Sequence, residues 1–326
     1  MTARIIDGTV LAADINAQTA SRAHALSKRG KHVKLVAVQV GENPAGRIYA
    51  NMQARKCASV AIRYELLILG QSSTEDDLRA TIARLNEDSS VNAIILQLPL
   101  PAHINARAVQ VEIDPRKDVE GVNPTNMGRL FFGPSPVAPC TPLAAVELLK
   151  RTRSDISGLE AVIVGHSEIV GKPIAMMLLQ SPDSSPTVTV CHVATRDLTF
   201  HTSRADVLIV AAGVSQARYL AWQRKREAGL KSPAPQLGPL IDASMIKPGA
   251  IVIDVAINRI PRGFDESGEP LLNSQGNMDM ITVGDVDFQQ AREVASAITP
   301  VPGGVGPVTT AMLLKNAVEC AAQCNA

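Results

Sequence analysis

The stretch AVIVGHSEIVGKP, residues 161–173, decides the fold of the second half of the chain. It opens with four small or branched apolar residues, which is typical of a short buried strand. A turn bounded by Gly165 and Gly171 follows, and then an Ala-, Met- and Leu-rich segment predicts a helix. A strand, a glycine turn and a helix in this order place backbone N–H groups and a helix N-terminus on a phosphate. The pattern Gly165, Ser167, Gly171 favours cofactor binding, although it has one glycine fewer than G-x-G-x-x-G.

The same alternation of strands and helices extends in both directions from this stretch. Strands are predicted at 34–40, 64–69, 91–98, 187–191, 206–211 and 250–255. Helices between strands predict parallel sheets covered on both faces, so the fold class is α/β. The segment PCTP (139–142) marks a junction between two such units, with Thr141 as helix N-cap and Pro142 at the first helical position. The sequence therefore predicts two α/β domains.

Composition restricts the possible partners. The chain has 326 residues, a formal net charge of +1 and 46% hydrophobic residues, so neither nucleic acid nor an anionic membrane is the expected partner. Its five cysteines are scattered without a CxxC pair, which favours neither a disulfide framework nor a metal site. No long apolar run occurs at the N-terminus or elsewhere. We expect a cytoplasmic protein that acts on a small molecule.

Polar residues gather where the strands of the first half end. Tyr49 and Gln53, in IYANMQARK (48–56), stand one turn apart on a predicted helix, so their side chains share a face. The loop QLPLP (97–101) follows the third strand, and a turn-rich loop, KDVEGVNPTNMGRL (117–130), comes next. Ligands of parallel sheets bind at the carboxyl ends of the strands. These residues predict a pocket for a hydrogen-bonding heterocycle, although Tyr49 would equally suit a packing role.

Two further segments frame the second unit. The stretch TPVPGGVGP (299–307) precedes an apolar helix that begins near Pro307, and its exposed amides would suit a carbonyl or anionic group of a ligand. Residues 216–245 contain Trp222 and the basic run RKR (224–226) and read as an elaboration of the fold. Three basic residues are too few for a nucleic-acid or membrane patch, so we interpret the run as a solvated helix face.

Taken together, these motifs resemble the methylenetetrahydrofolate dehydrogenase/cyclohydrolase family over most of the chain. The shared features, in order, are IIDG (5–8), the NPA loop followed by Tyr49, LQLPLP (96–101), KDVEG with NPTNMGRL, PCTP, VGHSEIVGKP, IDVAIN (253–258), GDVDF (284–288) and TPVPGGVGP. Their order and spacing make the resemblance specific, although no single motif would be specific by itself.

The resemblance implies a folate-binding catalytic domain of residues 1–141, completed by a C-terminal helix in 300–326, and a Rossmann-like domain of residues 142–299 that binds NADP or NAD. It also implies a homodimer without a metal. Family members transfer a hydride from 5,10-methylenetetrahydrofolate to the nicotinamide, and a cyclohydrolase step then hydrates the methenyl product to 10-formyltetrahydrofolate.

By position in these motifs, the resemblance also assigns site residues. The catalytic group would be Tyr49, Gln53 and Gln97. The substrate would contact Tyr49, Gln97, Leu98, Pro99, Glu120, Pro302, Gly303 and Gly304. The cofactor would contact Gly165, His166, Ser167, Ile169, Val170, Arg196, Ile257 and Thr309.

The most consequential departure from the family is Gln53, which stands where the family has a lysine. A lysine exchanges protons, whereas a carboxamide only donates and accepts hydrogen bonds. Hydride transfer to form a stabilised methenyl cation needs orientation, but hydration and ring opening need proton transfers. We therefore expect dehydrogenase activity with cyclohydrolase activity lost or weak. Lys56, seven residues after Tyr49, is the alternative proton carrier.

Other departures concern ligand preference. Glu120 replaces the family's aspartate and keeps the carboxylate on a longer side chain. His166, Val193 and Ala194 stand where a residue that binds the 2′-phosphate of NADP is often found, and Arg196 offers compensation, so the choice between NAD and NADP stays open. Two alternatives remain: a fully bifunctional enzyme that uses Lys56 or a water, and a non-catalytic folate- or nucleotide-binding protein.

Overall fold

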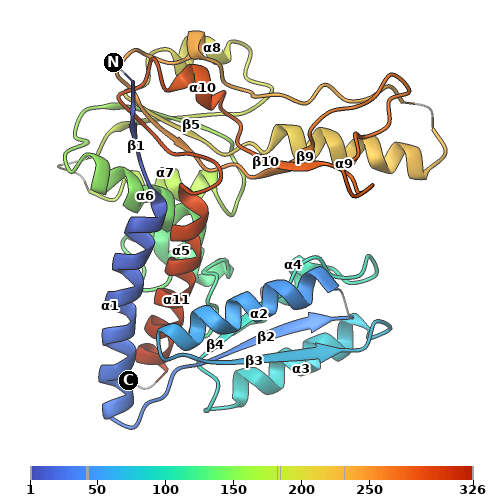
Figure 1. The fold of residues 1–326 in the computed structure, drawn as a ribbon. Coiled ribbons are helices and arrows are strands. Elements are labelled where there is room, and N and C mark those ends of the chain that lie inside the picture. The colour runs from blue at the N-terminus through green and yellow to red at the C-terminus, as the bar shows by residue number, and fades with distance from the viewer. Residues whose placement is uncertain (1, 42–43, 182, 184, 231, 325–326) are drawn as a thin grey trace. The chain divides into compact units, whose positions relative to one another are not determined.

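The computed structural model describes residues 2–41, 44–181, 183, 185–230 and 232–324, without the side chains of 44–49. The chain forms two compact units (Figure 1). The small-sheet unit comprises residues 10–143 and 308–326, and the large-sheet unit comprises residues 1–9 and 144–307. These limits differ from the predicted domains 1–141 with 300–326 and 142–299 mainly at the N-terminus. Residues 1–9 belong to the large-sheet unit because β1 (Arg4–Ile5) pairs with β11 (Ala297–Ile298).

The small-sheet unit is built on three parallel strands in the order β3-β2-β4. They are β2 (Lys34–Val40), β3 (Arg63–Leu69) and β4 (Ala93–Leu96). Figure 1 shows α2 (Pro44–Ser59) and α3 (Glu75–Glu87) on opposite faces of this sheet. The apolar residues of α3 pack on the strands, and Thr74 caps this helix through a capping box with Asp77.

Two long helices and three shorter ones complete this unit. Residues 10–28 of α1 (Gly8–Lys28) and 308–323 of α11 (Val305–Gln323) belong to it. The shorter helices are α4 (Ala106–Gln110), α5 (Pro124–Phe132) and the first residues of α6 (Cys140–Thr152). The predicted return of the C-terminal helix to the first domain is therefore confirmed. A buried Asn316 on α11 donates from Nδ2 to the carbonyl oxygens of Val119 and Ala138.

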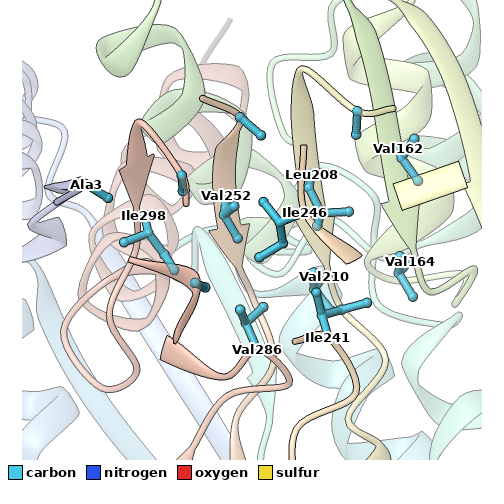
Figure 2. Close-up of a cluster of buried hydrophobic side chains, with 14 of the residues drawn as sticks. Ala3, Val162, Val164, Leu208, Val210, Ile241, Ile246, Val252, Val286 and Ile298 are labelled. Carbon is cyan, nitrogen blue, oxygen red and sulfur yellow. The ribbon is translucent and has the colours of Figure 1, made fainter. Parts of the chain in front are cut away.

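The large-sheet unit contains six parallel strands in the order β1-β11-β8-β7-β5-β6. The four not yet named are β5 (Glu160–Val164), β6 (Thr187–Cys191), β7 (Val207–Val210) and β8 (Ile251–Asp254). The helical segments around them are α7 (Gly171–Leu178), α8 (Leu198–Thr202), η1 (Ala243–Met245) and α10 (Phe288–Ala291). Figure 2 shows Val162, Leu208, Val252 and Ile298 from four strands meeting in one aliphatic core. The predicted doubly covered α/β class is confirmed for both units.

An accessory region extends the large-sheet unit. It joins α9 (Val214–Glu227) to a hairpin of β9 (Asn258–Pro261) and β10 (Met280–Val283), which run antiparallel. Tyr219 and Trp222 of α9 are buried against Ile260 in a small apolar cluster. Arg226 lies over the Trp222 ring at 4.8 Å and pairs with Glu269. The basic run 224–226 is exposed, but Arg226 also ties the helix to the hairpin.

Two predictions at loops were wrong. The segment 117–130, predicted as a loop, turns into α5 at Pro124. Asn123 accepts from the Thr125 N–H as N-cap, and Pro124 suits the first helical turn. Thr141 is not an N-cap, since α6 already begins at Cys140. Within the described ranges, no helix has the length and apolar composition needed to cross a membrane.

We predict that Asn316→Ala lowers the free energy of unfolding by about 2 kcal/mol, because two carbonyl oxygens in the protein interior lose their donor. The midpoint of urea unfolding measures the change. Gln18→Ala, which removes a carboxamide from the exposed face of α1, serves as the control and should change the midpoint little. Equal midpoints for Asn316→Ala and the unmodified protein would contradict this role of Asn316.

Candidate functional site

The centre of the candidate site in the small-sheet unit is the carboxamide of Gln53. Its side chain is only 4% exposed, and its Oε1 accepts two hydrogen bonds. One comes from the Tyr64 hydroxyl at 3.0 Å and the other from Gln97 Nε2 at 2.9 Å. Tyr64 lies in β3, and Gln97 directly follows β4. The structure thus brings together two of the three residues predicted as catalytic and adds Tyr64.

The other half of this carboxamide is unsatisfied. Gln53 Nε2 is buried and has no hydrogen-bond partner among the described residues. Tyr49 lies one turn earlier on α2, but its side chain falls outside the described part of the chain, so its predicted role stays a prediction. Lys56 is on the same helix and is exposed, in contrast to Gln53. The buried position therefore holds a carboxamide, and the lysine of this helix segment is at the surface.

The loop after Gln97 presents apolar surface to solvent. Leu98 is 57% exposed, and Pro99 is exposed beside it. Both residues follow the carboxyl end of β4, where a parallel sheet binds its ligands. Their predicted contact with substrate is compatible with this exposure.

Two acidic residues near β4 have different environments. Asp118 is buried and accepts from the backbone N–H groups of Gly121 and Asn123 and from Asn126 Nδ2, so it organises its own loop. Glu120 is half-buried and accepts from Gln110 Nε2 at 3.1 Å. Burial and, to a lesser degree, the charge of Asp118 raise the pKa of Glu120 to about 7. Of the two acids, Glu120 is the one available to a ligand.

The predicted glycine turn of the large-sheet unit lies between β5 and α7. Gly165 has φ +125°, and a Cβ there would lie 2.3 Å from the Ala211 carbonyl oxygen. A Cβ at Gly171 would lie 1.9 Å from the Gly165 carbonyl oxygen. Both positions therefore require glycine. Ser167 Oγ accepts from the Val170 N–H, and no side chain caps the N-terminus of α7. A tight turn with an uncapped helix start suits a phosphate.

Exposed side chains surround this turn. The His166 and His192 rings contact each other with centroids 4.8 Å apart and with their planes tilted by 37°. Ile169, within the turn, and Arg196, in the loop after β6, are exposed. His192 was not predicted as a site residue, although its place directly after β6, at a carboxyl strand end, is a signal for one.

The remaining predicted residues are divided between the units. Ile257, Pro302, Gly303 and Gly304 lie in the large-sheet unit, and Thr309 lies on α11 in the small-sheet unit. Ile257 is exposed just past β8, whereas Gly304 is buried. A Cβ at Gly304 would lie 2.6 Å from the Pro300 carbonyl oxygen, so close packing alone requires a glycine at this position. The ligand contacts assigned to these five residues stay predictions.

Two buried acids at the strand ends of the large-sheet unit were not anticipated. Asp285 accepts from the backbone N–H groups of Ala212, Gly213 and Val214. Asp254 accepts from those of Ala256, Asp285 and Val286, and burial raises its pKa to about 7. Both acids fix loops at carboxyl strand ends. In the described ranges, no group of three or more His, Cys, Asp and Glu side chains is placed to hold a metal ion.

Comparison with known families matches both halves of the chain. Residues 6–120 match the catalytic domain of tetrahydrofolate dehydrogenase/cyclohydrolase, and residues 139–224 and 235–325 match its NAD(P)-binding domain. The unmatched residues 225–234 lie within the segment 216–245 that the sequence analysis interprets as an elaboration.

Individual proteins agree with this match. The chain is 41% identical over 315 residues to the bifunctional protein FolD of Rhodobacter capsulatus, covering 97% of this chain and 92% of that protein. It is 40% identical over 321 residues to the bifunctional protein FolD of Bacillus licheniformis, covering 98% of each.

Solved structures are similar over the same extent. The bifunctional enzyme FolD of Campylobacter jejuni superposes with a TM-score of 0.80 at 38% identity, covering 98% of each chain. The methylenetetrahydrofolate dehydrogenase-cyclohydrolase of Trypanosoma brucei, solved with NADP and an inhibitor, gives a TM-score of 0.80 at 32% identity, covering 99% of this chain and 98% of that one. By sequence and by structure, over both of its units, the chain belongs to the tetrahydrofolate dehydrogenase/cyclohydrolase family.

Proposed function

We propose that this protein is an NAD(P)-dependent 5,10-methylenetetrahydrofolate dehydrogenase whose cyclohydrolase activity is absent or weak. The observation that carries the proposal is the buried carboxamide of Gln53, which is hydrogen-bonded to Tyr64 and Gln97. Family membership supports the folate substrate and the nicotinamide cofactor. The presence of glutamine at position 53 supports the loss of the cyclohydrolase reaction.

The dehydrogenase step requires two ligands held in register and no protein base. Hydride leaves the methylene carbon with its electron pair, and the folate nitrogens stabilise the resulting methenyl cation. The groups around Gln53, with Leu98, Pro99 and Glu120, would hold the folate. The turn from Gly165 to Val170 and the uncapped start of α7 would hold the cofactor's phosphates. Orientation of this kind supplies a large share of the rate of such reactions.

The cyclohydrolase step makes a different demand. Water adds to the methenyl carbon, a proton must leave this water, and the ring nitrogen that departs must be protonated. A carboxamide has no accessible titration and cannot perform either transfer. Lys56 is exposed rather than buried beside Gln53, which counts against it as a substitute. The fully bifunctional alternative is therefore the less favoured reading.

We predict that the purified protein reduces NAD or NADP with 5,10-methylenetetrahydrofolate but leaves 5,10-methenyltetrahydrofolate to decay at the buffer rate. Gln53→Lys should restore enzyme-dependent decay by about 100-fold or more, the usual contribution of a positioned acid–base group. Absorbance at two wavelengths separates reduced cofactor from the methenyl compound.

Met52→Lys is the matched control for this experiment. Met52 neighbours Gln53 on α2 but is exposed, so Met52→Lys adds the same positive charge outside the site. It should not restore decay. Enzyme-dependent methenyl decay in the unmodified protein would instead establish a bifunctional enzyme with another proton carrier, and absence of any cofactor reduction would point to a binding protein.

Glu120 gives the proposed folate site a pH dependence. Because its pKa is about 7 in the unliganded protein, only the ionised fraction can accept N–H donors of a pterin at both carboxylate oxygens. We predict that kcat/KM for methylenetetrahydrofolate rises about tenfold from pH 6 to pH 8 and then levels, since kcat/KM follows groups of the free enzyme. Glu120→Gln should lower kcat/KM and remove the rise. A flat profile in the unmodified protein would contradict the assignment.

The Glu120 carboxyl also makes the stability of the folded protein depend on pH. The pKa of Glu120 is raised from 4.5 to about 7 on folding, so the folded state holds its proton more tightly than the unfolded state. Stability therefore falls as pH rises from 4.5 to about 7 and is constant above. After allowance for the half-exposed side chain, Glu120→Gln should gain about 1–2 kcal/mol at pH 8 and little at pH 4. Urea unfolding at both pH values measures this, with Glu87→Gln as an exposed control.

A further inference from the structure

The hydrogen bonds at Gln53 use only one end of its carboxamide. An amide oxygen has two lone pairs, and Gln53 Oε1 meets two donors, the Tyr64 hydroxyl and Gln97 Nε2. The acceptor capacity of the group is therefore filled from within the protein. One contact comes from β3 and the other from the loop after β4, at 3.0 Å and 2.9 Å, so the amide is held from two separate segments.

The other end of the carboxamide, Nε2, carries two N–H donors. It is buried and has no partner among the side chains and backbone groups that the structure describes. A buried donor without a partner costs about 1–3 kcal/mol, so such groups usually have a ligand or water as a partner. With the oxygen held by Tyr64 and Gln97, any such partner must offer an acceptor atom.

We infer that Tyr64 is a positioning residue: with Gln97, its hydroxyl holds the Gln53 carboxamide so that Nε2 donates to an acceptor atom of the bound folate. This inference rests on the proposed function, which places the folate at Gln53. It adds a residue that does not itself touch the substrate and assigns a direction to the hydrogen bond that Gln53 makes with it. The site presents an uncharged donor where an ammonium group would present a cation.

The opposite amide orientation requires its neighbours to change as well, because the Tyr64 hydroxyl would have to accept a hydrogen bond instead of donating one. It would direct Nε2 to Tyr64 and Gln97, and Gln97 would then also have to turn so that its oxygen faces Gln53. Removal of the Tyr64 hydroxyl leaves one lone pair of Oε1 empty and weakens the preference for the orientation that serves the substrate. We therefore expect the effect of Tyr64 on turnover to pass through Gln53, and the experiment below tests this route.

The test is a double-mutant cycle on dehydrogenase activity. Tyr64→Phe removes only the hydroxyl and should lower kcat/KM for methylenetetrahydrofolate about five- to tenfold, the value of one neutral hydrogen bond, while KM for the cofactor stays the same. In a Gln53→Met background, where no amide remains to be held, Tyr64→Phe should change kcat/KM by less than about twofold. Tyr219→Phe removes a tyrosine hydroxyl from the large-sheet unit and should leave kcat/KM unchanged.

The outcomes separate this inference from the proposed function. An equal loss from Tyr64→Phe in both backgrounds means that Tyr64 acts on general structure and overturns the inference alone, as does a Tyr64→Phe protein with unchanged kcat/KM. No cofactor reduction by the unmodified protein overturns the proposed function and this inference with it.

A spectroscopic measurement covers the case in which Tyr64→Phe does not fold. The unmodified protein is labelled with ¹⁵N-glutamine, and the Gln53 Nε2H₂ signals are identified by their loss in Gln53→Met. Addition of 5-formyltetrahydrofolate, a stable folate, should shift these two proton signals as one of them gains an acceptor. Binding of this folate without a change in the Gln53 signals overturns the inference.

Discussion

Both units depend on one constraint: a carboxylate removed from water must receive hydrogen-bond donors. Asp118, Asp254 and Asp285 meet it through backbone N–H groups and, for Asp118 and Asp285, asparagine side chains. Each acid lies at a carboxyl strand end or in a loop beside one. The donors that satisfy them belong to the loops themselves, so the charge dictates the path of the chain. The surfaces predicted to bind ligands are built on these fixed loops.

The sequence predicts the regular core well because the core follows from local composition. Strands 34–40 and 187–191 have the limits found in β2 and β6, since runs of branched apolar residues suit a sheet that is covered on both faces. The α5 helix, which begins inside the predicted loop 117–130, escapes prediction, because a nine-residue helix rich in turn formers is stabilised mainly by its cap and by burial of Asn126 and Leu130. The hairpin of β9 and β10 escapes for a related reason, since its partner strands are far apart in sequence and its pairing is not encoded locally.

The residues of the candidate site also fall into two groups, those predicted from the sequence and those found only in the structure. Gln53 and Gln97 were predicted from motifs, and the structure adds their direct hydrogen bond. Tyr64 was missed because it stands in no motif, and Asp285 was missed because its motif, GDVDF, served only the resemblance. The roles of both come from contacts across strands and loops. A residue substituted at a catalytic position can be read from the sequence, but the neighbours that adapt to it only become visible in three dimensions. The neutral group at position 53 is matched by neutral donors on both sides.

The packing of α9 against the hairpin in the accessory region limits how the chain can be shortened. Tyr219 and Trp222 of α9 are buried in one cluster with Ile260 of the hairpin and with Leu237 packed against it. Arg226 of α9 pairs with Glu269, which lies between the two strands of the hairpin. The helix and the hairpin share this small core, so we expect them to unfold together as one cooperative unit. A shortened form of the chain would have to lose both segments together, because removal of either alone would expose the aromatic side chains of the other to solvent.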